Sequence, residues 1–239
     1  MFAVRPNKAR ANQVITAFYI MMGLTLLNTA LAVWQYFLFQ SFIERPANIN
    51  MANAHLSDSL DRLAAVINLI VRIITIVLFI RWFRRAYYNL HMAAPHEASY
   101  EEGWAAGAWF VPILNLFRPY QIMEEVWTGT QRALPHRFPD ITPPTMVGVW
   151  WALYLGMNIS ANVVVFKALK IQDVYDLGPL SVWSLIAQGF AIAATLVVII
   201  MIKKISSFED QLWDEAQNPS DSVFAATTAP GNWSPSSAS

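Results

Sequence analysis

The chain has 239 residues, of which 56% are hydrophobic and only 13% are charged, and its formal net charge is zero. Ordinary soluble domains are about 45–50% apolar and about 25% charged, so this composition indicates an integral membrane protein. Because the net charge is zero, the protein has no overall positive field that would attract nucleic acid. We therefore do not expect nucleic acid as a partner. The chain contains no cysteine, which excludes disulfides, thiol redox chemistry and cysteine-ligated zinc.

The first apolar run covers residues 14–39 and follows a basic segment that contains Arg5, Lys8 and Arg10. At 1.5 Å per residue this run is longer than the roughly 30 Å hydrocarbon core of a bilayer, which predicts a tilted transmembrane span. A signal peptide cut after Ala32 is the alternative, because a basic segment and a small-residue site are both present. The apolar run continues beyond that site, which favours an uncleaved span.

The second apolar run covers residues 63–82, and the polar residues 40–61 before it predict a loop. Two polar side chains, Asn68 and Arg72, interrupt this run. We expect its helix to continue beyond the span as far as Asn89, because the residues after Ile80 are basic and aromatic.

The central stretch from Phe79 to Trp127 carries the most distinctive sequence motifs of the chain. They are R-W-F-R-R-A-Y-Y-N at residues 81–89, G-W at 103–104, W-F-V-P-I-L-N-L-F-R-P at 109–119 and a Trp at 127. With R-P-N-K-A-R-A-N at residues 5–12 and W-Q-Y at 34–36, this order resembles a bacterial membrane-protein family catalogued as domain of unknown function 4328. The resemblance extends from Arg5 to about Asp210. It implies a multi-pass helical fold and transfers no catalytic residue.

Two later apolar runs, residues 146–169 and 180–202, are long enough to be spans. A Gly-Pro pair at residues 178–179 predicts a short loop between them. Beyond Lys204 we expect a short amphipathic helix, and residues 1–217 are predicted to form a single helical membrane domain. The serine- and proline-rich residues 218–239 predict a disordered tail.

The segment 103–119 decides the topology. If it crosses the membrane, the Lys and Arg residues outside the spans divide 8 to 7 between the two sides; if it does not cross, they divide 11 to 4. The second distribution fits the excess of positive charge found on cytoplasmic loops. Pro112 and Pro119 also break helical hydrogen bonding within it. We therefore predict an all-α protein with four spans, both termini in the cytoplasm, and a proline-broken re-entrant or interfacial segment.

Arg72 lies in the middle of the second run, roughly 13 Å from either end at helical rise, too far to reach an interface easily. Its cost of roughly 2.5–3.5 kcal/mol in a membrane makes it a candidate site residue. None of the four apolar runs contains an Asp or Glu to pair with it. The possible partners are side-chain amides, backbone carbonyls freed by the prolines, Glu124 or Glu125 folding inward, and an external anion.

Helical spacing places other polar side chains on the same faces of the predicted spans, which is typical of an interior seam. The candidate polar site comprises Arg72, Asn68, Asn115, Asn158, Asn162 and Gln188. It is either a structural clamp on the broken segment or a site for an anion or lipid headgroup. A stripe of small residues, Ala152, Gly156 and Ser160, predicts close helix packing.

His91, His96, Glu97, Glu101 and Glu102 supply metal-ligand types, but their spacing matches no metal motif, so we predict a solvated acidic loop. No cofactor and no catalytic residue is predicted, because the sequence contains neither a nucleophile elbow nor a Gly-rich phosphate loop.

Two functions remain open. The lack of a catalytic constellation favours a non-enzymatic structural or accessory protein of the bacterial cytoplasmic membrane, with the lipid bilayer and other membrane subunits or further copies of itself as partners. The alternative is a binding or transport protein for an anionic or amphiphilic molecule or lipid, centred on Arg72, since transporters often build their sites from discontinuous helices.

Overall fold

The computed structural model describes residues 4–44, 51–170 and 177–217, and within these ranges it is helical and contains no strand. Four helices are long: α1 (Lys8–Glu44), α2 (Met51–Ala93), α5 (Thr145–Ala168) and α6 (Leu177–Gln217). Each of these four is long and apolar enough to cross a membrane. The predicted all-α fold, with four helices long and apolar enough to span a membrane, is therefore confirmed. The predicted tail, residues 218–239, lies outside the described residues.

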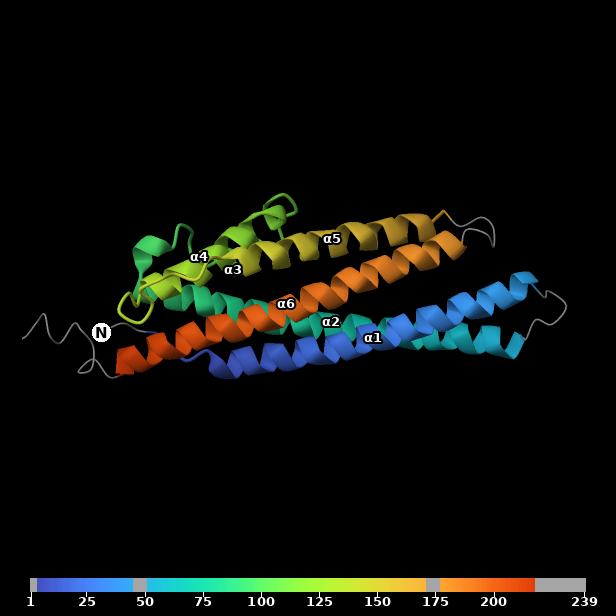
Figure 1. Ribbon diagram of the computed structural model, residues 1–239, viewed down its shortest axis with the longest axis horizontal. Helices are drawn as coiled ribbons and strands as arrows, with labels where there is room; N and C mark the ends of the chain where they lie inside the picture. The colour runs from blue at the N-terminus through green and yellow to red at the C-terminus, as the bar shows by residue number, and fades with distance from the viewer. Residues whose placement is uncertain (1–3, 45–50, 171–176, 218–239) are drawn as a thin grey trace, which may run out of the picture.

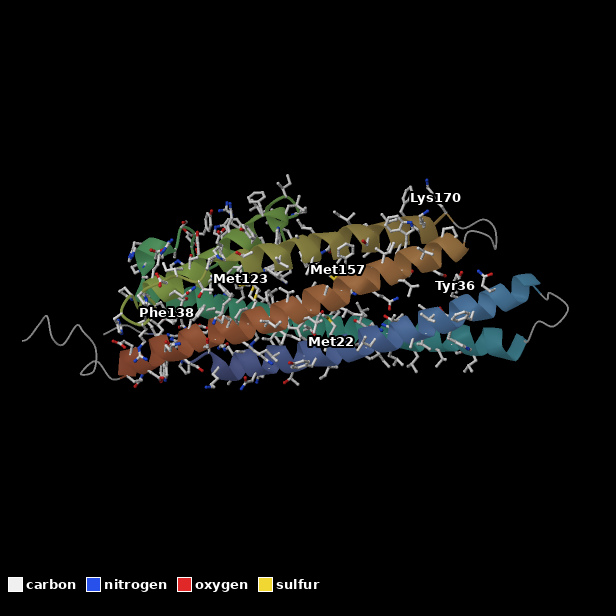
Figure 2. The ribbon with its side chains drawn as sticks, viewed as in Figure 1. Met22, Tyr36, Met123, Phe138, Met157 and Lys170 are labelled. Carbon is white, nitrogen blue, oxygen red and sulfur yellow. The ribbon has the colours of Figure 1, made fainter. Side chains whose placement is uncertain are left out.

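The long helices lie side by side, and the start of α1 and the finish of α6 lie at the same end of the molecule (Figure 1). We call this the proximal end and the opposite end, where α1 finishes and α6 begins, the distal end. Helix α1 packs against α2 and α6, and α5 packs against α6. Helix α5 runs from the Phe79 region, where Trp150 packs on Phe79, toward the distal end, near which Figure 2 shows Lys170.

Two predicted boundaries are wrong. The loop expected at residues 40–61 is mostly helical, because α1 ends at Glu44 and α2 already begins at Met51. Residues 51–61 contain no Gly or Pro and several strong helix formers, so the helix can extend beyond the apolar run. The fourth span and the amphipathic helix after Lys204 form one continuous helix, α6. Pro179 lies in the first turn of α6, where backbone N–H groups have no partner within the helix, so the missing N–H of proline costs no hydrogen bond.

The proximal half of the molecule contains the buried core. Helix α4 (Arg118–Arg132) packs there against α2, α5 and α6. The largest fully buried side chains are mostly aromatic or aliphatic: Trp82, Phe83, Tyr87 and Leu90 from α2, Ile122, Met123 and Trp127 from α4, and Met201, Ile202 and Ile205 from α6. The distal half instead exposes apolar side chains such as Leu69, Ile159 and Val182 on three different helices. Helices that expose apolar residues in this way match a lipid environment.

The segment between α2 and α4 is broken as its prolines predict. It contains only short turns of helix, η2 (Pro95–Glu97), α3 (Trp104–Gly107) and η3 (Leu114–Leu116). The segment first runs beside the proximal part of α2, where the Tyr87 hydroxyl donates to the carbonyl of Tyr100. It then extends along α2 as far as Phe79, against which Trp109 packs edge-on. It then returns along α4, and Phe138 packs against Phe208 near the proximal end.

This path turns back without traversing the length of the bundle, and residues 103–119 contain no helix long enough to be a candidate span. Its turning point carries apolar side chains outward: Phe110 is 74% exposed and Ile113 is 73% exposed. Exposed apolar side chains at the tip of a hairpin match an apolar environment better than water.

Candidate functional site

A cavity of about 380 Å³ lies among α1, α2, α5, α6 and the broken segment. Its lining is mainly apolar and aromatic, with a few polar side chains. Of the six residues in the predicted polar site, four line this cavity: Asn68, Arg72, Asn115 and Asn158. The other two, Asn162 and Gln188, are not among its lining residues. The fold therefore brings together residues that are up to 90 positions apart in the sequence.

Arg72 lines the cavity and is itself exposed on α2. Within the described ranges, its guanidinium takes part in no hydrogen bond and no ion pair with another side chain or carbonyl. The neighbouring polar residues of α2 are satisfied locally, because Thr75 donates to the carbonyl of Val71 at 2.8 Å and Asn68 to that of Ala64 at 2.7 Å. Arg72 is therefore a cation in an apolar segment without a protein partner among the described residues.

The side chains that were expected to pair with Arg72 have other partners. Asn28 and Asn68 exchange two hydrogen bonds with each other, at 3.0 and 3.3 Å. Gln188 accepts a hydrogen bond from Thr29 at 2.6 Å. Glu125 accepts one from the hydroxyl of Tyr87 at 2.8 Å.

The asparagines of α5 are also satisfied within their own helix. Asn158 donates to the carbonyl of Tyr154 at 2.7 Å, and Asn162 donates to that of Asn158 at 2.8 Å. The predicted clamp between Arg72 and the broken segment is thus absent from the contacts that the structure describes. Among the predicted partners, an external anion and the side-chain oxygen of Asn115 therefore remain available to Arg72.

Two buried polar atoms of the cavity-lining residues also lack a hydrogen-bond partner in the described part of the chain. They are the indole Nε1 of Trp109 and the side-chain Oδ1 of Asn115. A buried polar atom without a partner costs about 1–3 kcal/mol, so such atoms call for an explanation. The nearby Trp151 shows the ordinary case, because its Nε1 donates to the carbonyl of Leu116 at 3.2 Å.

An aromatic cluster fixes the position of Trp109. Its ring meets those of Phe79, Tyr154 and Trp151 edge-on, at centroid separations of 5.6, 5.9 and 6.2 Å. Edge-to-face pairs at such separations contribute about 0.5–1.5 kcal/mol each beyond simple burial. The broken segment is thereby held against α2 and α5, with Trp109 and Asn115 both at the cavity.

The cavity combines the properties of a small-molecule site. Its volume falls in the usual range of about 300–1,000 Å³, and apolar walls with a few polar groups are typical of ligand pockets. The apolar walls suit a hydrocarbon chain, while Arg72 and the unpartnered Trp109 N–H can donate hydrogen bonds to an oxyanion. The arrangement can therefore bind an amphiphile with a negatively charged group.

The alternative metal site is not assembled. His91 lies between two carbonyl oxygens, those of Tyr87 and Tyr100, each 2.9 Å from a ring nitrogen. Glu97 pairs with Arg132 at 2.7 Å, and Glu102 pairs with Arg84 at 3.1 Å. Among the described residues, no group of three or more His, Asp or Glu side chains could hold a metal ion.

Two features of the proximal end are not anticipated by the sequence motifs. One is a buried network in which Glu209 accepts hydrogen bonds from Asn7 and Asn89. The other is a second cavity, lined by five arginines from the N-terminal segment and α2. Both join segments that are far apart in the sequence, although the basic cluster at residues 81–85 is a visible signal for the second.

Comparison with family models matches residues 45–207 to a family described as domain of unknown function (DUF4328). The match covers all four cavity-lining residues of the predicted site. Comparison with curated proteins and with solved structures gives no match.

Proposed function

This chain belongs to the DUF4328 family, and we propose that it is a membrane protein that binds an anionic amphiphile in the cavity around Arg72. The single observation that carries the proposal is the guanidinium of Arg72, which lies in an apolar helix without a described partner and lines a cavity with the unpartnered polar atoms of Trp109 and Asn115. An anionic headgroup would accept hydrogen bonds from Arg72 and from the Trp109 N–H, whereas the Asn115 oxygen is itself an acceptor and would need a donor such as a hydroxyl of that headgroup. No catalytic role is part of the proposal.

The proposal includes a location, the bacterial cytoplasmic membrane, with the proximal end in the cytoplasm. Of the described Lys and Arg residues outside the spans, eleven fall toward that end and three toward the other, which supports this orientation by the positive-inside tendency. In this orientation residues 103–119 form a re-entrant or interfacial segment. Its exposed Phe110 and Ile113 would contact lipid of the cytoplasmic leaflet.

The structural or accessory function is the competing proposal. It explains the four packed helices equally well, but it gives no reason for an unpaired Arg72 beside a cavity. In a purely structural protein, that charge costs roughly 2.5–3.5 kcal/mol without compensation. The geometry therefore favours a binding function.

The test uses the full chain purified in a non-ionic detergent and a dodecanoate brominated on its chain, which quenches tryptophan fluorescence when it binds nearby. Trp109 and Trp150 both line the cavity and report on this contact. Dodecanol with the same bromination serves as the uncharged probe. We expect the carboxylate to bind at least about tenfold more tightly than the alcohol, since hydrogen bonds to a charged group are worth about 1.5–3 kcal/mol.

The variant Arg72→Gln should lose the preference for the carboxylate while it continues to bind the alcohol. Arg72→Lys should keep part of the preference, because a point charge remains although the bidentate geometry is lost. Arg62→Gln is the matched control, since Arg62 is an arginine on the same helix that does not line the cavity. Equal affinities for the two probes in the wild-type protein would reject the proposal and favour the structural function.

A further inference from the structure

A second cavity, of about 450 Å³, lies where the basic segments of α1 and α2 meet. Five arginines line it, Arg5, Arg10, Arg81, Arg84 and Arg85, together with Ile80, Tyr88, Glu102 and Ala106. We call it the arginine pocket. Glu102 is the one carboxylate among these lining residues. The lining thus holds five guanidinium groups and a single carboxylate, which leaves a strong local positive potential.

Most of these arginines are held in place by contacts that leave donors free for a ligand. The guanidinium groups of Arg5 and Arg85 make cation–π contacts with the ring of Tyr88, at 4.8 Å and 5.6 Å from its centroid. Arg10 donates to the carbonyl of Arg81 at 3.3 Å. Stacking on a ring face fixes a guanidinium without using its N–H groups, so the pocket is organised before a ligand arrives.

The charges of the pocket repel one another. Burial lowers the pKa of Arg10, and the positive charges of Arg85, Arg81, Arg5 and Arg84 lower it further. The ion pair between Arg84 and Glu102 relieves only part of this repulsion. Several basic residues elsewhere at the proximal end have a carboxylate partner, as Lys8 has in Asp210 and Arg132 in Glu97. The unusual feature is therefore the concentration of positive charge in one cavity.

The position of the pocket indicates the kind of anion that it would meet. It lies at the proximal boundary of the apolar run, and Ile80 lines both the arginine pocket and the Arg72 cavity. Clusters of four to eight basic residues directly beside a transmembrane helix are typical of sites for anionic lipid headgroups. Arginine is also the residue best suited to phosphate, because its planar group donates two parallel hydrogen bonds.

We infer that the arginine pocket binds a phosphate-bearing anion, which is either the headgroup of an anionic phospholipid in the adjacent leaflet or a soluble phosphate compound. This site is separate from the Arg72 cavity and does not depend on the function proposed for it. The adjoining apolar residues favour the phospholipid as the source.

The test measures the affinity of the full chain in a non-ionic detergent for three probes: a short-chain phosphatidylglycerol, a short-chain phosphatidylcholine and pyrophosphate. The pocket variant is Arg81→Gln with Arg84→Gln. The matched control is Arg132→Gln with Arg137→Gln, which removes the same charge at the same end of the molecule. Arg84 and Arg132 are 52% and 50% exposed and each is paired with one glutamate, so the two variants disturb the fold to similar extents.

We expect wild-type protein to bind phosphatidylglycerol more tightly than phosphatidylcholine. The pocket variant should lose about 25-fold in affinity, at about 1 kcal/mol for each arginine, whereas the control should lose less than about threefold. The variant Glu102→Gln should bind the anion about five times more tightly, since it removes the competing carboxylate. A gain of affinity cannot result from damage to the fold.

The two sources of phosphate give different results. Tight binding of phosphatidylglycerol with weak binding of pyrophosphate identifies the lipid, and the reverse identifies a soluble compound. Arg72→Gln should leave the affinity for pyrophosphate unchanged, and in an Arg72→Gln background, where the other cavity has lost its cation, the pocket variant should still lose more phosphatidylglycerol binding than the control. Failure here and failure of the function proposed for the Arg72 cavity can thereby be told apart. Equal losses in the pocket and control variants, or no binding of either anion by the wild-type chain, would overturn the inference.

Discussion

The carboxylate of Glu209 and the side chain of Asn7 are hydrogen-bonded, with Asn7 Nδ2 2.9 Å from Glu209 Oε2, although 202 positions separate the two residues. Asn89 donates to the same carboxylate at 2.9 Å. Asn89 also bonds both the N–H and the carbonyl of Arg5. This network ties the segment before α1 to α2 and to the last turns of α6, and it holds Arg5 at the arginine pocket.

The network makes stability depend on pH. Glu209 lies beyond Lys204, outside the apolar run of α6, and burial raises the pKa of its carboxyl from 4.5 to about 7, against the lowering effect of the Asn7 and Asn89 donors. The folded chain keeps this proton up to a higher pH than the unfolded chain does. The contribution of Glu209 to the free energy of unfolding should therefore be largest below a pH of about 4.5 and should fall until a pH of about 7. At about 1.4 kcal/mol per pKa unit, the loss is about 3 kcal/mol.

Thermal unfolding of the detergent-solubilised protein between pH 5 and pH 8 measures this effect. The variant Glu209→Gln is uncharged throughout, so its melting temperature should be less sensitive to pH than that of the wild type. Parallel curves for the two proteins would show that the carboxyl of Glu209 has the same pKa in the folded and unfolded chains.

Two tryptophans of the central aromatic cluster should respond differently to the same substitution. Trp151→Phe removes the hydrogen bond to the carbonyl of Leu116, whereas Trp109→Phe removes an N–H that has no described partner. Both substitutions replace an indole by a phenyl ring, and Trp151, which is also the more buried of the two, loses a hydrogen bond as well, so Trp151→Phe should be the less stable variant by about 1 kcal/mol. Trp109→Phe should instead weaken binding of the dodecanoate probe. Denaturant unfolding and the quenching assay separate these effects, and the opposite ranking of stabilities would contradict the assignment.

The path of the broken segment predicts which sites are accessible from outside the cell. In this cysteine-free chain, single cysteines at Ser99 and Asp140 flank the segment, and both positions are exposed. Neither should react with a membrane-impermeant thiol reagent in intact cells, whereas a cysteine at the exposed Lys170 should react. All three should react once the cells are permeabilised. Labelling of Asp140→Cys but not of Ser99→Cys in intact cells would mean that the segment crosses the membrane.

The contact between α5 and α6 depends on a glycine. A Cβ atom at Gly156 would lie 2.8 Å from Cε1 of Phe190, so Gly156→Val should displace the Phe190 ring from the contact between the helices and cost about 1–3 kcal/mol. Gly148 lies on the same helix with nothing within 4 Å of such an atom, and Gly148→Val should leave stability within a few tenths of a kcal/mol. Thermal unfolding of the two variants tests this difference, and similar melting temperatures would show that Gly156 is not a close-packing position.

Much of the fold follows from the sequence alone. The lengths of the apolar runs predict four spanning helices, because the number of residues needed to cross a bilayer is fixed by helical rise. The prolines at 112 and 119 predict a broken segment, because each removes a backbone donor. The small-residue stripe that includes Gly156 predicts a close helix contact, and the α5–α6 packing agrees with it. The ends of the helices are less well predicted, since polar residues such as 51–61 are also good helix formers.

The candidate site was only partly predictable. Arg72 stands out in the sequence because a charge within an apolar run is costly wherever the helix faces. The sequence does not tell which side-chain amides lie near Arg72. Helical periodicity predicts on which face of its helix a residue lies, but it does not predict which residue of another helix packs against that face. The tertiary structure brings Asn115 and Trp109 to the Arg72 cavity, leaves Asn162 and Gln188 outside its lining, and joins Arg5 and Arg10 with the arginines of α2. These contacts depend on how four long helices and one hairpin pack together, and packing is decided by the whole set of side chains at once.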